Sequence, residues 1–248
     1  MIWKFTYLLV PIFLFTFLFN VNGQKTFSEG VEAYNQKNYA LAVEEFEKAL
    51  ATNENDVAAW YNLGLSNLGL KKYGEAIFNF EKVLKLTPND SEAESKIEYS
   101  FGQLHPDLEW RPRLNSIQSS LYSLTINVWG GISIALSCFC ALGVVFYIHQ
   151  KKSSLKSAFL VITIFLFGCL IGSLVICTNV QSYITNDSFA VVTNKSIPTF
   201  IENSQSPKTT IPEGVRVEVI EKKQSDFVEV KTITGEVHVV RTKDLRFI

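Results

Sequence analysis

The sequence predicts a multidomain membrane protein, in which an all-α repeat domain and a small all-β barrel flank a hairpin of two transmembrane helices. Three observations lead to this fold class: long uncharged apolar blocks, a 34-residue repeat before the last two of them, and an alternating apolar pattern after them. The chain has 248 residues, of which 47% are hydrophobic. Because much of this apolar content is concentrated in blocks, it indicates membrane segments rather than one large core.

The first apolar block, residues 1–23, has the pattern of a secretory signal peptide. Lys4 is the single charge ahead of its long apolar run. Val21 and Gly23 supply the small side chains expected before a cleavage point at Gln24. An uncleaved anchor is the alternative, because glycine is a poor cleavage residue and the apolar run is long. In both interpretations, the residues after this block lie outside the cytoplasm.

The other two apolar blocks, residues 126–148 and 158–178, are predicted to be transmembrane helices joined by the loop 149–157. Neither contains a charged side chain, and each is long enough as a helix to cross about 30 Å of hydrocarbon. The loop is basic, and its topology-determining residues are Lys151, Lys152 and Lys156. Basic loops stay in the cytoplasm, so both soluble parts are expected on the periplasmic side of the inner membrane. The absence of ionisable residues indicates anchors rather than an ion path.

Residues 24–104 are predicted to form a helical repeat domain, which a linker over 105–125 joins to the membrane. Aligning the repeats 24–56 and 57–90 pairs residues of the same type 34 positions apart. A period of 34 residues with two short helices in each copy is typical of tetratricopeptide repeats. Because two repeats bury little core, residues 91–104 are expected to form a capping helix.

The second repeat shows the tetratricopeptide pattern best, and its characteristic residues are Trp60, Leu63, Gly64, Ala76, Phe80 and Pro88. Gly64 and Ala76 are small where the two antiparallel helices cross closely. Phe80 fills the gap to the next helix, and Pro88 ends the unit because proline cannot continue a helix.

The first helix of each repeat is expected to line a concave groove for a partner. The predicted groove residues are Phe27, Val31, Tyr34, Tyr61, Leu65 and Leu68. All are aromatic or aliphatic, which suits an amphipathic helix or an apolar strand from another protein. The alternative is that this face packs on the chain's own capping helix or on a second copy.

Residues 188–248 change to the period of two that strands require. The segments 215–219 and 227–231 alternate strictly, and Thr234 with Gly235 forms a turn. Several short strands in about 60 residues indicate a small barrel, and the layout resembles a bacterial SH3-like domain. The family's Gly-Trp-Val is replaced here by residues 238–240, among which His238 is interpreted as a surface strand residue.

Composition argues against catalysis and against several classes of ligand. The net charge of −1 gives no reason to expect nucleic acid. All four cysteines lie within the apolar blocks, where they are expected to pack as small hydrophobic residues. No nucleophile grouping or carboxylate pair emerges, so we expect no enzyme, no metal site and no cofactor.

The order of these parts resembles the BatE family of the Bacteroides aerotolerance operon. The resemblance rests on the Trp60 to Pro88 repeat, on the hairpin with its lysines, and on residues 190–193 leading to Glu213 and Gly214. It implies a scaffold or adaptor in a cell-envelope complex with membrane proteins that bear von Willebrand factor A domains, and a link to oxygen or stress tolerance. The alternative function is a receptor that senses peptidoglycan through the SH3-like domain.

Overall fold

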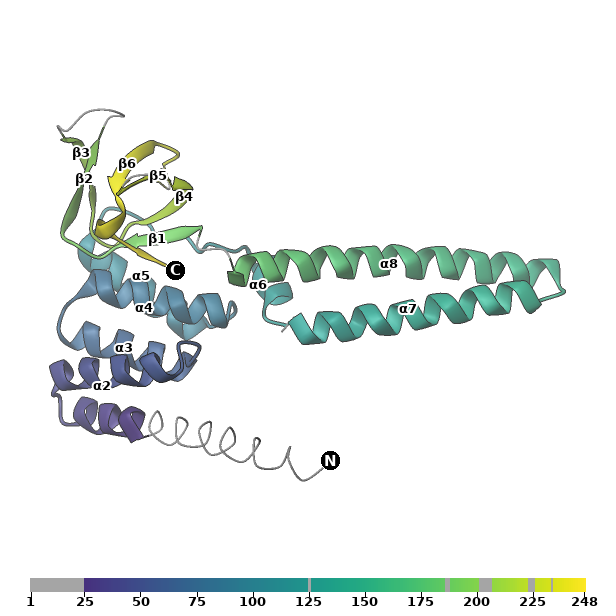
Figure 1. The fold of residues 1–248 in the computed structure, drawn as a ribbon, viewed down its shortest axis with the longest axis horizontal. Helices are drawn as coiled ribbons and strands as arrows, with labels where there is room; N and C mark the ends of the chain where they lie inside the picture. Colours follow the sequence, from purple (N-terminus) through teal and green to yellow (C-terminus); the bar gives the residue numbers. More distant parts are fainter. Residues whose placement is uncertain (1–24, 125, 186–187, 201–206, 223–225, 233) are drawn as a thin grey trace, which may run out of the picture. The chain divides into compact units, whose positions relative to one another are not determined.

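A computed structural model describes residues 25–124, 126–185, 188–200, 207–222, 226–232 and 234–248 (Figure 1). The predicted signal peptide lies outside these residues. The chain divides into two compact units. The first unit combines the residues before Arg113 with those after Asn186, and the second unit comprises the residues between them.

The first unit begins with a stack of antiparallel helices. The helical segments are 25–35, α2 (Tyr39–Thr52), α3 (Val57–Gly69), α4 (Tyr73–Leu86) and α5 (Ser91–Leu104). Two helix caps and two backbone turns also recur at a spacing of 34 residues. The Asp56 and Asp90 carboxylates accept from the N–H groups of Ala59 and Ala93, at 3.0 and 2.9 Å. Lys37 and Lys71 both adopt left-handed φ, 61° and 57°, in the turn inside each repeat.

Glycine is required where the two helices of a repeat cross. A Cβ atom at Gly30 would lie 2.7 Å from the ring of Phe46, and one at Gly64 would lie 2.7 Å from the ring of Phe80. Both rings are fully buried. The rings therefore occupy the space that a side chain would need, and they pack against the bare backbone. Trp60 contacts the cores of both repeats and so joins them.

The second unit is a helical hairpin. Its helices are α6 (Ser116–Tyr122), α7 (Ile126–His149) and α8 (Ser153–Thr185). By length and composition, α7 and α8 are able to cross a membrane, with mean hydropathies of 2.2 and 2.8. The helix α8 extends past both ends of the apolar block 158–178, because the polar residues that flank the block are also helical.

Small and hydroxyl side chains bring α7 and α8 together. The hydroxyls of Ser133 and Ser173 lie 2.9 Å apart, and both residues are buried. A Cβ atom at Gly143 would collide with the Thr163 hydroxyl. In an apolar environment such contacts stabilise the packing of two helices. Small residues allow the two backbones to approach each other, and the hydroxyls have few other hydrogen-bond partners there.

After the hairpin, the chain forms an antiparallel sheet. Its strands are β1 (Phe189–Val192), β2 (Ser196–Phe200), β3 (Pro207–Pro212), β4 (Arg216–Lys222), β5 (Phe227–Lys231), β6 (Val237–Arg241) and β7 (Leu245–Phe247). Their order in the sheet is β3-β2-β6-β5-β4-β1-β7. Gly214 and Gly235 take positive φ values of 80° and 88° in the turns that lead to β4 and β6.

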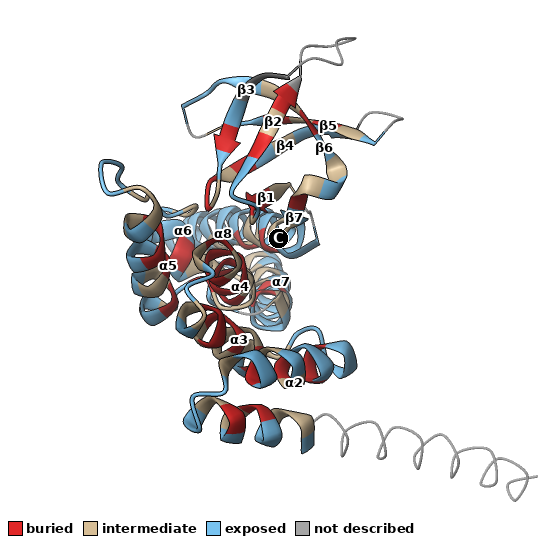
Figure 2. Cartoon of the chain, turned by 90° about the vertical axis from the view of Figure 1, so that its left-hand side faces the viewer, coloured by how far each residue is buried: buried red, intermediate tan, exposed pale blue. Residues whose placement is uncertain are grey.

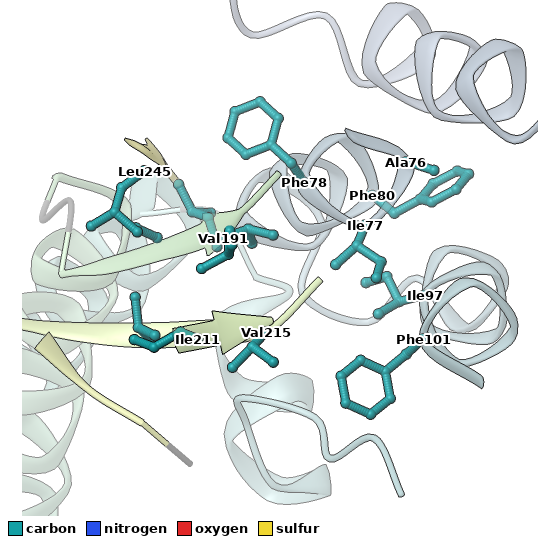
Figure 3. Close-up of a cluster of buried hydrophobic side chains, with 14 of the residues drawn as sticks. Ala76, Ile77, Phe78, Phe80, Ile97, Phe101, Val191, Ile211, Val215 and Leu245 are labelled. Atoms are coloured by element: carbon teal, nitrogen blue, oxygen red, sulfur yellow. The ribbon is translucent and has the colours of Figure 1, made fainter. Parts of the chain in front are cut away.

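The sheet and the repeats share one hydrophobic core, although the hairpin separates them in sequence. Ile77 of α4 and Ile97 of α5 belong to the same buried cluster as Val191 of β1 (Figure 3). Figure 2 shows buried residues concentrated along α4, which has the sheet on one side and α3 on the other. The sheet therefore covers the C-terminal end of the repeat stack, where a further repeat would otherwise be needed.

Polar contacts close this shared core at its margin. Arg216 Nη1 lies 2.6 Å from Glu81 Oε1, and the two side chains are only 11% and 2% exposed. Arg216 also donates to the carbonyl of Arg111 at 2.9 Å. Glu213 Oε1 accepts from the N–H of Gly74 at 2.9 Å, and a ring nitrogen of His105 lies 2.7 Å from the Glu213 carbonyl. These bonds fix the orientation of the sheet on α4 and α5.

Substitution of Gly64 by alanine should destabilise the protein by about 1–3 kcal/mol, because the new methyl group would displace the buried Phe80 ring. Thermal unfolding of the full chain in detergent, followed by circular dichroism, measures the effect. Gly102→Ala is the matched control: its Cβ atom would meet nothing within 4 Å in helix α5. Alanine there should maintain or raise the midpoint. Equal destabilisation by both variants would contradict the close crossing.

Removal of the charge on Glu81 should cost about 3 kcal/mol or more, because Arg216 would remain buried without its counter-charge. The measurement is chemical denaturation of Glu81→Gln in detergent. Glu75→Gln, on the same helix, is the control, because Glu75 pairs with Arg246 where the side chains are 30% and 43% exposed. Its cost should stay below about 1 kcal/mol. A loss for Glu81→Gln no larger than that of the control would show that the buried pair does not hold the sheet.

Candidate functional site

The structure places the six predicted groove residues on the first helices of the two repeats, where all are partly buried. It does not bring them into a single cluster. Phe27, Val31 and Tyr34 pack against the core of the first repeat. Tyr61, Leu65 and Leu68 pack against the larger core that the second repeat shares with the sheet.

Three of these aromatic rings also support the second helix of their own repeat. The ring of Phe27 meets that of Phe46 edge to face, with centroids 5.7 Å apart, and Tyr61 meets Phe80 in the same way at 5.5 Å. Tyr34 packs edge to face on Tyr39, also at 5.5 Å. One side of each ring therefore packs inside its own repeat. Only the opposite side remains for a partner.

Tyr61 connects α3 to the capping helix. Its hydroxyl donates a hydrogen bond to the Glu92 carboxylate of α5. Burial raises the pKa of Tyr61, and the hydrogen bond to Glu92 raises it further. The phenol therefore stays protonated at neutral pH and remains a donor. The predicted face thus does contact the chain's own capping helix at this residue.

Tyr99 extends the predicted face, and the sequence interpretation missed it. It follows Leu65 by 34 residues, as Leu65 follows Val31, and it lies on α5 with 55% of its surface exposed. The same period places Ser95 after Tyr61 and Gly102 after Leu68. Extending the period into the capping helix would have identified the residue. The helix 25–35, α3 and α5 therefore present equivalent positions.

The helices that carry these positions differ in charge. The central helix α3 has no charged residue over Val57–Gly69. The helix α5 carries three acidic residues, Glu92, Glu94 and Glu98, and one basic residue, Lys96. Burial, and then the nearby Glu81 and Asp90 carboxylates, raise the pKa of Glu94. A surface that is uncharged at its centre and acidic beside it favours an apolar or basic partner over an anionic one.

The three lysines that were predicted from the sequence to determine the topology lie where α7 turns into α8. Lys151 and Lys152 are exposed in the turn, and Lys156 lies in the first part of α8. The Lys156 ammonium group is 5.3 Å from the centre of the Tyr147 ring. Residues 113–186 contain no aspartate or glutamate, so this end of the hairpin is positively charged without local compensation.

A second candidate site is a cleft of about 510 Å³ between the repeats and the sheet. Phe101, Leu108, Glu109 and Arg111 line it from the helical side. Thr210, Ile211, Pro212 and Val215 line it from the β3 side, and Thr232, Thr234, Glu236 and His238 line it from the β5–β6 hairpin. We interpreted His238 from the sequence as a surface strand residue. Its side chain is only 18% exposed, and Nε2 lies 3.4 Å from Glu236 Oε2.

Neither surface has the features of a metal centre. Within the part of the chain that the structure describes, no three His, Cys, Asp or Glu side chains gather closely enough to hold a metal ion. The four cysteines are free thiols on α7 and α8.

The family model of the tetratricopeptide repeat matches residues 57–90, which contain α3 and α4. No curated protein matches the chain. The matched segment coincides with the second of the two repeats, and the first repeat has the same turn geometry and glycine crossing. The protein therefore contains helical repeats of the tetratricopeptide type, a module for binding proteins, together with two apolar helices able to cross a membrane and an antiparallel sheet domain.

Proposed function

We propose that this protein is a membrane-anchored adaptor of a bacterial cell-envelope complex, which binds protein partners through its helical repeats. The row of apolar side chains at equivalent positions of successive first helices, Val31, Leu65 and Tyr99, carries the proposal. These side chains retain exposed surface in a module whose general role is protein binding. Such a row suits the apolar face of a partner helix, which presents its own side chains at spacings of three and four residues.

The shared core supports a topology in which both soluble segments lie on one side of the membrane. Ile97 precedes the hairpin and Val191 follows it, yet both belong to one buried cluster. Segments that pack together cannot lie on opposite faces of a bilayer. The lysines of the turn favour the cytoplasm for that turn, which supports a periplasmic position for the repeats and the sheet at the inner membrane.

The parts of the chain have separate tasks in this proposal. Residues 24–104 form the repeat domain, and residues 188–248 form an SH3-like domain that completes it. Residues 126–148 and 158–178, joined by the loop 149–157, form the anchor. The absence of Asp, Glu, Lys and Arg from both spans supports an anchoring role.

The partner class follows from the resemblance to the BatE family of the Bacteroides aerotolerance operon. In that setting the adaptor would join membrane proteins that bear von Willebrand factor A domains, and would serve tolerance to oxygen or stress. The apolar row beside an acidic helix is compatible with a protein partner that offers apolar and basic side chains.

Tyr99→Asp should reduce partner recovery at least tenfold, because a carboxylate would replace an exposed apolar contact at the end of the row. The measurement is quantitative mass spectrometry of von Willebrand A-type membrane proteins that copurify with the solubilised chain. Leu41→Asp is the matched control, since Leu41 is 41% exposed on α2 and lies outside the row. Equal recovery with both variants, or no such protein with the unmodified chain, would contradict the adaptor function.

Alkaline phosphatase fused after Ile248 should be active, because the enzyme folds only outside the cytoplasm and the proposed topology exports the C-terminus. The same enzyme inserted after Lys152 should be inactive. For each of the two fusions, phosphatase activity is measured in cells and divided by the amount of fusion protein. The inverse pattern would refute the periplasmic placement of the repeats and the sheet.

A further inference from the structure

The short helix α6 distributes its side chains in the opposite way from a helix in water. The residue that it buries is Ser119, whereas Ile117 has 74% of its surface exposed. Leu121 follows Ile117 by four residues, so the two lie on one side of the helix. A helix in water turns its apolar side chains inward, because burial removes them from the solvent. The distribution in α6 suits surroundings that are apolar on the side of Ile117.

The long helices of the hairpin show the same distribution. Ser133 of α7 and Ser173 of α8 are buried, while Ile134 and Phe165 are each 69% exposed. Lipid explains this distribution in helices that cross a bilayer, since acyl chains cover the outer apolar side chains and polar groups pack between helices. The helix α6 belongs to the same compact unit and comes directly before α7 in the chain. Its exposed apolar side therefore has the pattern of a helix in contact with lipid.

The helix α6 is too short to cross a bilayer. Its 7 residues span about 10 Å, whereas the hydrocarbon core is about 30 Å thick. The other exposed residues of the helix, Ser116, Gln118 and Ser120, are polar. A short helix with an apolar side and a polar side fits the boundary between headgroups and acyl chains, because each side then meets a matching environment.

Aromatic contacts hold α6 against the beginning of α7 and the end of α8. The indole N–H of Trp129 in α7 donates to the Leu121 carbonyl at 3.0 Å. The rings of Tyr122 and Tyr183 of α8 lie 5.4 Å apart, and the Arg113 guanidinium lies 4.1 Å from the centre of the Tyr183 ring. Tryptophan and tyrosine are enriched at membrane boundaries, because each has an apolar body and a polar group. These contacts support a position of α6 at the level where the hairpin enters the bilayer.

The first turn of α6 is stabilised by its own residues. The Asn115 side chain accepts from the N–H of Gln118 at 2.8 Å, and the Gln118 side chain accepts from the N–H of Asn115 at 3.2 Å. This capping box pairs backbone donors that the start of a helix otherwise leaves without partners. It thereby lowers the free-energy cost of placing this end of α6 near lipid.

We propose that α6 is an interfacial helix that binds the phospholipid leaflet in which α7 begins and α8 ends. Ile117 and Leu121 contact acyl chains, and Ser116 and Ser120 face headgroups and water. Phospholipid is the occupant of the apolar side because the three consecutive helices of the hairpin unit share one distribution of buried serines and exposed apolar side chains. This inference rests on the membrane anchor of the proposed function. It adds a contact that fixes the depth of the hairpin in the bilayer.

The test measures the depth of single positions of the full chain in phosphatidylcholine nanodiscs. The four native cysteines are replaced by alanine, and one new cysteine is labelled with bimane. The labelled variants are Ile117→Cys on the apolar side of α6, Ser120→Cys on its polar side, and Phe139→Cys, which is exposed near the middle of α7. The nanodiscs contain lipid with a nitroxide either close to the headgroup or at the centre of the bilayer. Iodide in the buffer measures access from water.

At Ile117, the nitroxide close to the headgroup should quench the label about twofold more strongly than the central nitroxide, because interfacial helices are buried about 5–10 Å deep. At Phe139 the order of the two nitroxides should be reversed. Iodide should quench the label at Ser120, the matched control on the same helix, more strongly than the label at Ile117.

Strong quenching by iodide and weak quenching by both lipids at Ile117, with the expected result at Phe139, would overturn the inference and leave the membrane anchor intact. Stronger quenching of Ile117 by the central nitroxide would also overturn it, since α6 would then lie inside the span. If the Ile117 label were shielded from lipid and iodide only in nanodiscs that hold two chains, a second copy would be the occupant and lipid would not. Absence of lipid quenching at Phe139 as well would refute the anchor, and with it this inference.

Discussion

The buried ion pair between Glu81 and Arg216 joins residues 135 positions apart and closes a core to which segments before and after the hairpin contribute. A buried charge is stable only while its counter-charge is present. If the segment that carries one charge moved away, the other charge would remain without its partner, at a high cost in free energy. The remaining organisation depends on this constraint. The chain leaves the first unit at Pro112 and forms the hairpin. It then returns to the first unit, where the sheet packs on α4 and α5.

The shared core also explains how two repeats suffice. Repeat stacks expose an apolar face at each end, and a short stack gains little stability from its interior. Here the sheet covers α4 and α5, and the apolar residues Val191 and Val215 take the place of a following repeat. Because this contact engages α4 and one side of α5, Tyr99 on the same helix stays exposed. Stability and binding therefore use different sides of one helix.

Features with a local cause were predictable from the sequence alone. The 34-residue period, the small residues at Gly30 and Gly64, the apolar hairpin and the alternating strands all depend on neighbours within one repeat, one hairpin or one strand. The six groove residues were located on the correct helices, and their role in binding stays a prediction. Contacts between distant segments leave no periodic signal, so only the tertiary structure determined that Arg216 meets Glu81 and that His238 lines a cleft with Phe101. The physical reason is that periodicity reports which side of an element is buried, whereas the identity of the segment that covers it depends on the shape and charge of the whole folded unit.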